Sequence, residues 1–156
     1  MIASFKRIHL PDFLQELVDE ARTLFDDAQI EYDIPADRGT IVVSGNDVLL
    51  REVFYNLLNN SVVAAGPGGR IRISARIADD GGVECRFEDS GPGLSAEEEE
   101  KVFDRFYRGK HSHQGGSGLG LAIVKQIVQL HRGTIRATRS ADLGGAAMHM
   151  HFPRAH

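Results

Sequence analysis

The stretch Glu52–Gly66 reads Glu-Val-Phe-Tyr-Asn-Leu-Leu-Asn-Asn-Ser-Val-Val-Ala-Ala-Gly, and it decides how the rest of the chain is interpreted. Apolar residues cover most of the helix that this stretch predicts, which is typical of a buried helix; they are Leu49, Leu50, Val53, Phe54, Leu57, Leu58, Val62 and Val63. Glu52, Asn56 and Asn60 recur every fourth residue and therefore form one polar stripe along it. Because a buried amide without a partner is costly, the stripe predicts a polar group opposite it, and we favour a ligand.

The end of this helix has two interpretations. Asn59 or Asn60 could cap it, but the apolar pattern continues to Ala65. The sequence Gly66-Pro67-Gly68-Gly69 is the stronger stop signal, because glycine favours the position after a helix and proline cannot continue one.

Size and composition indicate one domain over residues 1–156, with 42% hydrophobic and 26% charged residues. A net charge of −4 argues against a general nucleic-acid binder. Cys85 is the single cysteine, so an internal disulfide is excluded. No apolar run approaches the ~20 residues of a membrane span, and no secretory signal is present. We therefore expect a cytoplasmic domain without direct membrane contact; any anchor of a parent protein would lie outside this chain.

The segments before the central helix are interpreted as scaffold. Alternation and apolar spacing predict a strand over 5–9, a helix from Pro11 to Phe25, and strands over 30–34 and 40–43. Gly45-Asn46-Asp47 supplies turn chemistry and a cap for the central helix.

After Gly69 the pattern changes to the period of two that a half-buried strand shows. Ile71, Ile73, Ala75 and Ile77 are expected to face inward, and Asp79–Gly82 is a hairpin turn. On the returning strand Val83, Cys85 and Phe87 face inward, opposite to Glu84, Arg86 and Glu88. Asp89 continues the inward register, so its carboxylate requires a hydrogen-bond partner.

Asp89-Ser90-Gly91-Pro92-Gly93 has two interpretations. All of these residue types favour turns. Two glycines beside an inward carboxylate also describe a backbone that a flat ligand can approach closely.

The remaining segments combine a helix cap, aromatic anchors and a glycine-rich stretch. Ser95 and Glu98 match a capping box, and the acidic run 97–100 then suits the first turn of a helix better than a metal site. The stretch 109–117 is polar and glycine-rich, as in a mobile lid, so His111 and His113 are interpreted as solvated rather than as metal ligands.

Gly116-Ser117-Gly118-Leu119-Gly120 precedes an amphipathic helix that ends near Gly133. Free amides at such a helix start favour phosphate, although glycine also permits close helix packing. Strands over 134–139 and 147–152 complete the chain; Gly144-Gly145 lies in the turn between them, and Met148, Met150 and Phe152 face inward.

The order and spacing of these pieces resemble the catalytic ATP-binding domain of sensor histidine kinases, within the wider family that includes gyrase, Hsp90 and MutL. Asn56-Leu57-Leu58-Asn59-Asn60 resembles the N box, and Asp89–Gly93 the G1 box. Phe103–Phe106 is similar to the F box, and Gly116–Gly120 to the G2 box. The resemblance implies an α+β fold, the two-layer α/β sandwich called the Bergerat fold. A mixed sheet of about five strands would pack on three main helices, with a flexible ATP lid.

The resemblance also implies the site residues and the cofactors ATP and Mg²⁺. Asp89 would accept the adenine amino group, and Gly91 and Gly93 would let the backbone approach the ring. Asn60 would ligate Mg²⁺ with Asn56 near the phosphates. The implied phosphate contacts are Arg108, Lys110, Gly116, Gly118, Leu119 and Gly120. The implied catalytic group consists of Asn56, Arg108 and Glu52, although an orienting or outward role for Glu52 is equally compatible with its position.

The implied reaction is transfer of the γ-phosphate to a histidine on a separate dimerisation domain, which then serves a response regulator. This chain contains no phosphoacceptor helix of the His-Glu-x-x-x-Pro type, so the isolated domain is expected to bind nucleotide with little autophosphorylation.

Some positions depart from the family pattern and leave alternatives open. Val63-Ala64 stand where many kinases have Lys-Tyr, which leaves room for a degenerate binding module. The last glycine-rich turn also lacks the usual Thr. A hydrolase of the gyrase or MutL kind would need a Glu at position 56, where this chain has Asn. An anti-sigma-type serine kinase shares the fold but usually lacks a Phe box.

Overall fold

The computed structural model describes residues 4–34, 41–105 and 120–155, and one five-stranded sheet draws strands from all three segments. Its order is β2 (Gln29–Asp33), β4 (Arg70–Ile77), β5 (Val83–Asp89), β7 (Ala146–Phe152) and β6 (Thr134–Arg139). β2 runs parallel to β4, and the other neighbours are antiparallel. The expected mixed sheet of about five strands is confirmed.

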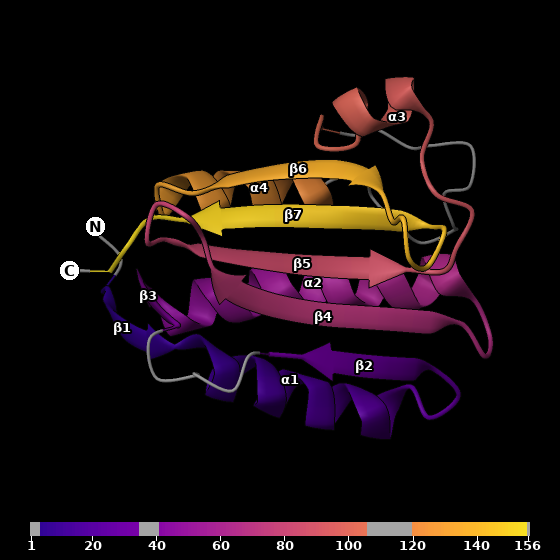
Figure 1. Ribbon diagram of the computed structural model, residues 1–156, viewed down its shortest axis with the longest axis horizontal. Coiled ribbons are helices and arrows are strands. Elements are labelled where there is room, and N and C mark those ends of the chain that lie inside the picture. Colours follow the sequence, from indigo (N-terminus) through magenta and orange to yellow (C-terminus); the bar gives the residue numbers. More distant parts are fainter. Residues whose placement is uncertain (1–3, 35–40, 106–119, 156) are drawn as a thin grey trace.

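Three long helices cover one face of this sheet: α1 (Leu10–Leu24), α2 (Asp47–Ala65) and α4 (Gly120–Leu130). Figure 1 shows α2 and α4 behind the sheet and α1 beside β2, with the short α3 (Ala96–Lys101) at one end next to β6. The core lies between the two layers, where the ring of Phe54 stacks 5.8 Å from that of Phe87. This arrangement is the expected two-layer α+β sandwich.

A second, two-stranded antiparallel sheet joins β1 (Lys6–His9) to β3 (Val42–Gly45). The prediction that the turn begins at Gly45 is wrong by one residue, because Gly45 is the last residue of β3. A Cβ at Gly45 would lie 2.7 Å from the buried ring of His131 and 2.8 Å from Leu50, so packing rather than turn chemistry requires glycine. Asn46 caps α2 as predicted, since its side chain accepts a hydrogen bond from Leu49 N at 2.9 Å.

The prediction that α2 is buried around most of its surface is wrong. Its buried residues form one face, Leu50, Val53, Phe54, Leu57, Leu58 and Ser61, whereas Val63 is 40% exposed. Glu52 and Asn60 are exposed and Asn56 is half-buried, so burial does not by itself demand a partner for the stripe. The helix ends at Gly66, whose N–H donates to Val62 O, and this excludes the alternative cap at Asn59 or Asn60.

Two strand residues differ from the expectation in burial. Ile77, the last residue of β4, is 39% exposed although it was expected to face inward. Glu88 is only 3% exposed although its register places it opposite to the core, and a hydroxyl group satisfies it there. Among the described residues, no helix is both long and apolar enough to cross a lipid bilayer.

Candidate functional site

Asp89 is the last residue of β5, and the residue as a whole is 5% exposed. The inward register predicted from the alternation is confirmed. Its Oδ1 accepts hydrogen bonds from Gly91 N at 2.9 Å and Ala146 N at 3.2 Å. Burial raises the pKa of Asp89 above its ordinary value of 3.8, and the two amides partly counteract this because they stabilise the ionised form. The required partners are thus backbone amides from two separate segments.

The second oxygen of Asp89, Oδ2, accepts no hydrogen bond from the described residues. Both hydrogen bonds go to Oδ1, and no buried side-chain oxygen of the described residues lacks a partner. Oδ2 is therefore accessible to a donor from outside the protein. A carboxylate held by one oxygen and open at the other is a strong, directional acceptor.

The two glycines after Asp89 have different structural roles. A Cβ at Gly91 would lie 2.4 Å from the carbonyl oxygen of Ala64, so the close approach there is to the C-terminal end of α2. Gly93 has a φ of +76°, a conformation that side chains disfavour. Glycine at position 91 was expected to allow a ligand to approach the backbone. Its packing against α2 is a second explanation, because that contact alone requires glycine.

The sequence interpretation missed the contribution of the β6–β7 turn, residues 140–145. Gly145 N donates to the backbone oxygen of Asp89 at 3.0 Å, and a Cβ on Gly145 would lie 2.2 Å from Asp89 Oδ1. Only Gly144 of the glycine pair has positive φ, +88°. Gly145 does not need to be glycine for the geometry of the turn. Its presence beside Gly144 was therefore the sequence signal for a close contact at this position.

The polar stripe of α2 lies next to the start of α4. Asn56 Nδ2 donates to Glu52 O at 2.8 Å, and a Cβ on Gly120 would lie 3.5 Å from Asn56 Oδ1. Asn60 follows one helical turn later and is exposed. The side chain of Glu52 is exposed and makes no hydrogen bond or ion pair with the described residues. The structure thus brings Asn56 and Gly120 together, while Glu52 remains without an assigned contact.

α2 connects these two groups of residues. Its Ala64 carbonyl lies against Gly91, and its Asn56 lies against Gly120. The two positions are eight residues apart, or roughly 12 Å along a helix axis. One helix therefore joins the Asp89 carboxylate to the N-terminus of α4, where free amides favour anions.

Several predicted site residues lie outside the described residues, namely Arg108, Lys110, Gly116, Gly118 and Leu119, together with Phe106, His111 and His113. Phe103 is described, and it is buried in the core. The described ranges contain no cluster of three carboxylate, imidazole or thiol groups that could hold a metal ion. A hollow of about 560 Å³ lies around Arg86 and His149 on the helix-free face of the sheet, and none of the predicted site residues that the structure describes lines it.

The chain is similar to known proteins over most of its length. Residues 45–156 match the family model described as histidine kinase-, DNA gyrase B- and HSP90-like ATPase. The chain is 31% identical over 155 residues to the sensor protein kinase PmrB of Pseudomonas aeruginosa, covering 99% of this chain and 32% of that protein. It is 39% identical over 128 residues to the signal transduction histidine-protein kinase BaeS of Escherichia coli K12, covering 80% of this chain and 26% of that protein. The chain thus spans about a third or less of these two relatives.

Solved structures give the same similarity at the level of the fold. The mycobacterial sensor histidine kinase MprB has a TM-score of 0.83 at 30% identity, with 96% of this chain and 97% of that chain covered. The ATP-binding domain of PrrB from Mycobacterium tuberculosis has a TM-score of 0.78 at 28% identity, with 97% and 98% covered.

Proposed function

Because the chain belongs to the family of histidine kinase-, DNA gyrase B- and HSP90-like ATPases, we propose that it binds Mg-ATP and transfers the γ-phosphate to a histidine of a separate domain. Sensor histidine kinases among its relatives support the choice of reaction. The observation that carries the proposal is the carboxylate of Asp89, buried, bonded at Oδ1 by two amides and open at Oδ2.

In this proposal Asp89 recognises the base. The exocyclic amino group of adenine donates to Oδ2, while the amides of Gly91 and Ala146 stabilise the ionised form of the carboxylate and orient it. A hydrogen bond to a charged partner contributes about 1.5–3 kcal/mol. A base with a carbonyl group at the same position would place an acceptor against an acceptor, so the site favours adenine over guanine.

With its base at Asp89, the bound nucleotide extends along α2 and directs its phosphates toward α4. The ~12 Å between Ala64 and Asn56 suits an extended nucleotide, which brings its phosphates to the start of α4 at Gly120. We assign Arg108, Lys110 and the amides of Gly116, Gly118 and Leu119 to these phosphates from the motif resemblance.

The residues of α2 that face this region fit a metal ion carried by the substrate. The exposed amide of Asn60 supplies one neutral oxygen ligand, and phosphate oxygens and water complete the coordination, as Mg²⁺ commonly requires. When bound, Mg²⁺ neutralises developing negative charge on the phosphates. Asn56 and Arg108 orient the terminal phosphate for transfer, and Glu52 is available to assist the acceptor.

Residues 1–156 form a single catalytic domain in this proposal. The acceptor histidine belongs to a dimerisation domain of the same or a partner kinase, and the phosphoryl group then passes to a response regulator. We place the domain in the cytoplasm, where ATP is available, without contacts to nucleic acid or membrane.

Replacement of Asp89 tests the base site. Asp89→Asn keeps the size of the side chain but replaces a charged acceptor by a neutral amide, so ADP binding measured by calorimetry should weaken about 10–100-fold. Asp79→Asn, at an exposed position in the β4–β5 hairpin, is the matched control and should bind as the unchanged chain does. Equal affinity of the Asp89 and Asp79 variants would contradict the adenine assignment.

Phosphotransfer is tested by mixing the domain with candidate dimerisation domains, Mg²⁺ and γ-labelled ATP. Label on the partner that is labile in acid and stable in base indicates phosphohistidine. Steady phosphate release without any acceptor would indicate a hydrolase, and acid-stable label would indicate a serine kinase.

A further inference from the structure

The turn between β6 and β7 forms one wall of the Asp89 site. The amide of Ala146 donates to Asp89 Oδ1 at 3.2 Å, and Gly145 N donates to the backbone oxygen of Asp89 at 3.0 Å. A Cβ at Gly145 would lie 2.2 Å from Oδ1, so no space separates the turn from the carboxylate. A small displacement of this turn therefore changes the hydrogen bonding of Asp89.

The same turn is attached to the other face of β5 through Glu88. Neighbouring residues of a strand point to opposite faces, so Glu88 lies on the helix-free face while Asp89 points toward the helices. The Ser140 hydroxyl donates to Glu88 Oε1 at 2.9 Å, and Ser140 and Glu88 are 1% and 3% exposed. The turn thus holds the end of β5 from both faces.

Ser140 also organises the turn internally. Its Oγ accepts from Leu143 N at 3.0 Å, and its backbone N–H donates to Gly145 O at 2.7 Å. One buried side chain therefore joins Glu88 to the backbone that leads directly into Gly145 and Ala146. The hydroxyl acts both as donor to the carboxylate and as acceptor from the turn.

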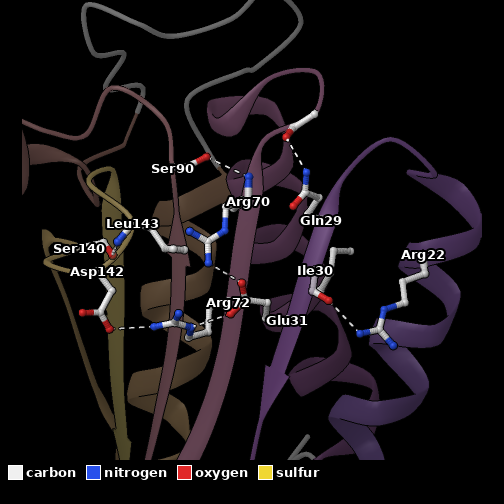
Figure 2. Close-up of polar contacts among 11 residues, drawn as sticks. Arg22, Gln29, Ile30, Glu31, Arg70, Arg72, Ser90, Ser140, Asp142 and Leu143 are labelled. Atoms are coloured by element: carbon white, nitrogen blue, oxygen red, sulfur yellow. Dashed lines mark hydrogen bonds and ion pairs between the residues drawn. The ribbon is translucent and has the colours of Figure 1, made fainter.

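An ion chain on the same face supports this attachment. Arg72 Nε donates to Glu31 Oε2 at 3.1 Å, and Arg72 Nη1 donates to Asp142 Oδ2 at 2.8 Å. Figure 2 shows Arg72 between Glu31 of β2 and Asp142 of the turn, with Ser140 and Leu143 close by. The Asp142 side chain is 65% exposed, so solvent screens this ion pair and it is the weaker of the two attachments.

We propose that Ser140, through its bond to Glu88, is the positioning residue that holds the 140–145 turn against Asp89, with Asp142 and Arg72 in a supporting role. By placing the Ala146 amide on Oδ1, it keeps the carboxylate oriented with Oδ2 presented to the base. The part of this inference that concerns the base rests on the proposed function. The part that concerns the carboxylate is independent of any ligand.

The first test measures the pKa of Asp89 by carboxyl-¹³C NMR in the absence of nucleotide. Ser140→Ala removes the bond to Glu88 and should raise the pKa of Asp89 by roughly 0.5–1 unit, because a hydrogen bond to the ionised form is weakened. Ser74→Ala is the matched control: Ser74 lies on the same face of the sheet, and its hydroxyl makes no hydrogen bond with the described residues. The same pKa in both variants would overturn the inference.

The second test measures ADP affinity of the same variants by calorimetry. Ser140→Ala should weaken binding about 3–10-fold relative to Ser74→Ala. A raised pKa together with unchanged affinity would overturn the part of the inference that concerns presentation of Oδ2 to the base. If the unchanged chain does not bind ADP, the proposed function fails, and the pKa measurement still decides whether Ser140 positions Asp89.

A further variant keeps the tests decisive if Ser140→Ala does not fold. Glu88→Gln retains an oxygen acceptor of the same shape but removes its charge, so it weakens the Ser140 bond without opening a cavity. Because removal of the neighbouring Glu88 charge by itself lowers the pKa of Asp89, the readout for this variant is ADP affinity, which should fall less than in Ser140→Ala. Unchanged affinity in this folded variant would overturn the inference.

Discussion

Replacing Gly145 by alanine adds one methyl group at the most crowded point of the Asp89 site. The new Cβ would lie 2.2 Å from Asp89 Oδ1, 2.4 Å from Asp89 O and 2.6 Å from Gly91 N. All three distances are far below van der Waals contact, and two of the three atoms belong to the backbone. Either the carboxylate or the turn must therefore move.

The cost can be worked out from the hydrogen bonds that such a movement breaks. Loss of the bond from Gly145 N to Asp89 O costs about 0.5–1.5 kcal/mol, and loss of the charge-assisted bond from Ala146 N costs about 1.5–3 kcal/mol. Together they predict a loss of roughly 2–4.5 kcal/mol in the free energy of unfolding. If the displaced carboxylate also loses its bond to adenine, ADP binding weakens about 10–100-fold.

The assays are urea unfolding and ADP calorimetry, with Gly144→Ala as the neighbouring control. No atom of the described residues lies within 4 Å of a Cβ at Gly144, so the penalty expected is that of the positive φ of +88°, about 1–2 kcal/mol in stability. This control should retain ADP binding. If Gly145→Ala bound ADP as tightly as Gly144→Ala, the contact between the turn and the carboxylate would not govern the site.

Further predictions concern other parts of the molecule. Burial, with Arg136 and Arg86, lowers the pKa of His149 from 6.5 to about 4, so the unfolded chain gains this proton first on acidification. The free energy of unfolding should therefore fall as the pH drops from 6.5 to about 4, and less steeply in His149→Gln; equal slopes would contradict this. Burial raises the pKa of the Cys85 thiol to about 12, so a thiol reagent at about pH 8 should label it only in denaturant; rapid labelling of the folded chain would show that β5 opens. Ser95→Ala removes the capping box of α3 and should lower stability by about 1 kcal/mol in urea unfolding, and an unchanged midpoint would contradict that role.

Local residue patterns predicted most of the helices and strands correctly. The period of two placed β4 and β5 correctly, and the Ser95–Glu98 spacing identified a capping box that forms with both of its hydrogen bonds. These features depend on residues close together in the chain, whose geometry follows from backbone periodicity. The inward position of Asp89 followed from the same alternation.

Residue patterns gave wrong predictions of burial where burial depends on contacts with segments distant in the sequence. The apolar residues of α2 predicted burial on most sides, yet Val63 is exposed because the sheet and α4 contact only part of the helix. Glu88 was assigned to the solvent face by its register and is nevertheless buried, since the turn that contains Ser140 folds over it. The contacts that bury one residue and expose the other come from segments distant in sequence.

Residue patterns were enough to predict the order of the helices and strands, the inward carboxylate at position 89 and the family motifs. The backbone groups around that carboxylate became visible only in the folded chain: Gly91 packs against Ala64 of α2, and Gly145 and Ala146 come from the last turn. The physical reason is that periodicity records the direction of a side chain, whereas its partners are set by packing between segments far apart in the chain. The attachment of that turn to Glu88 by the Ser140 hydroxyl belongs to the same class of information.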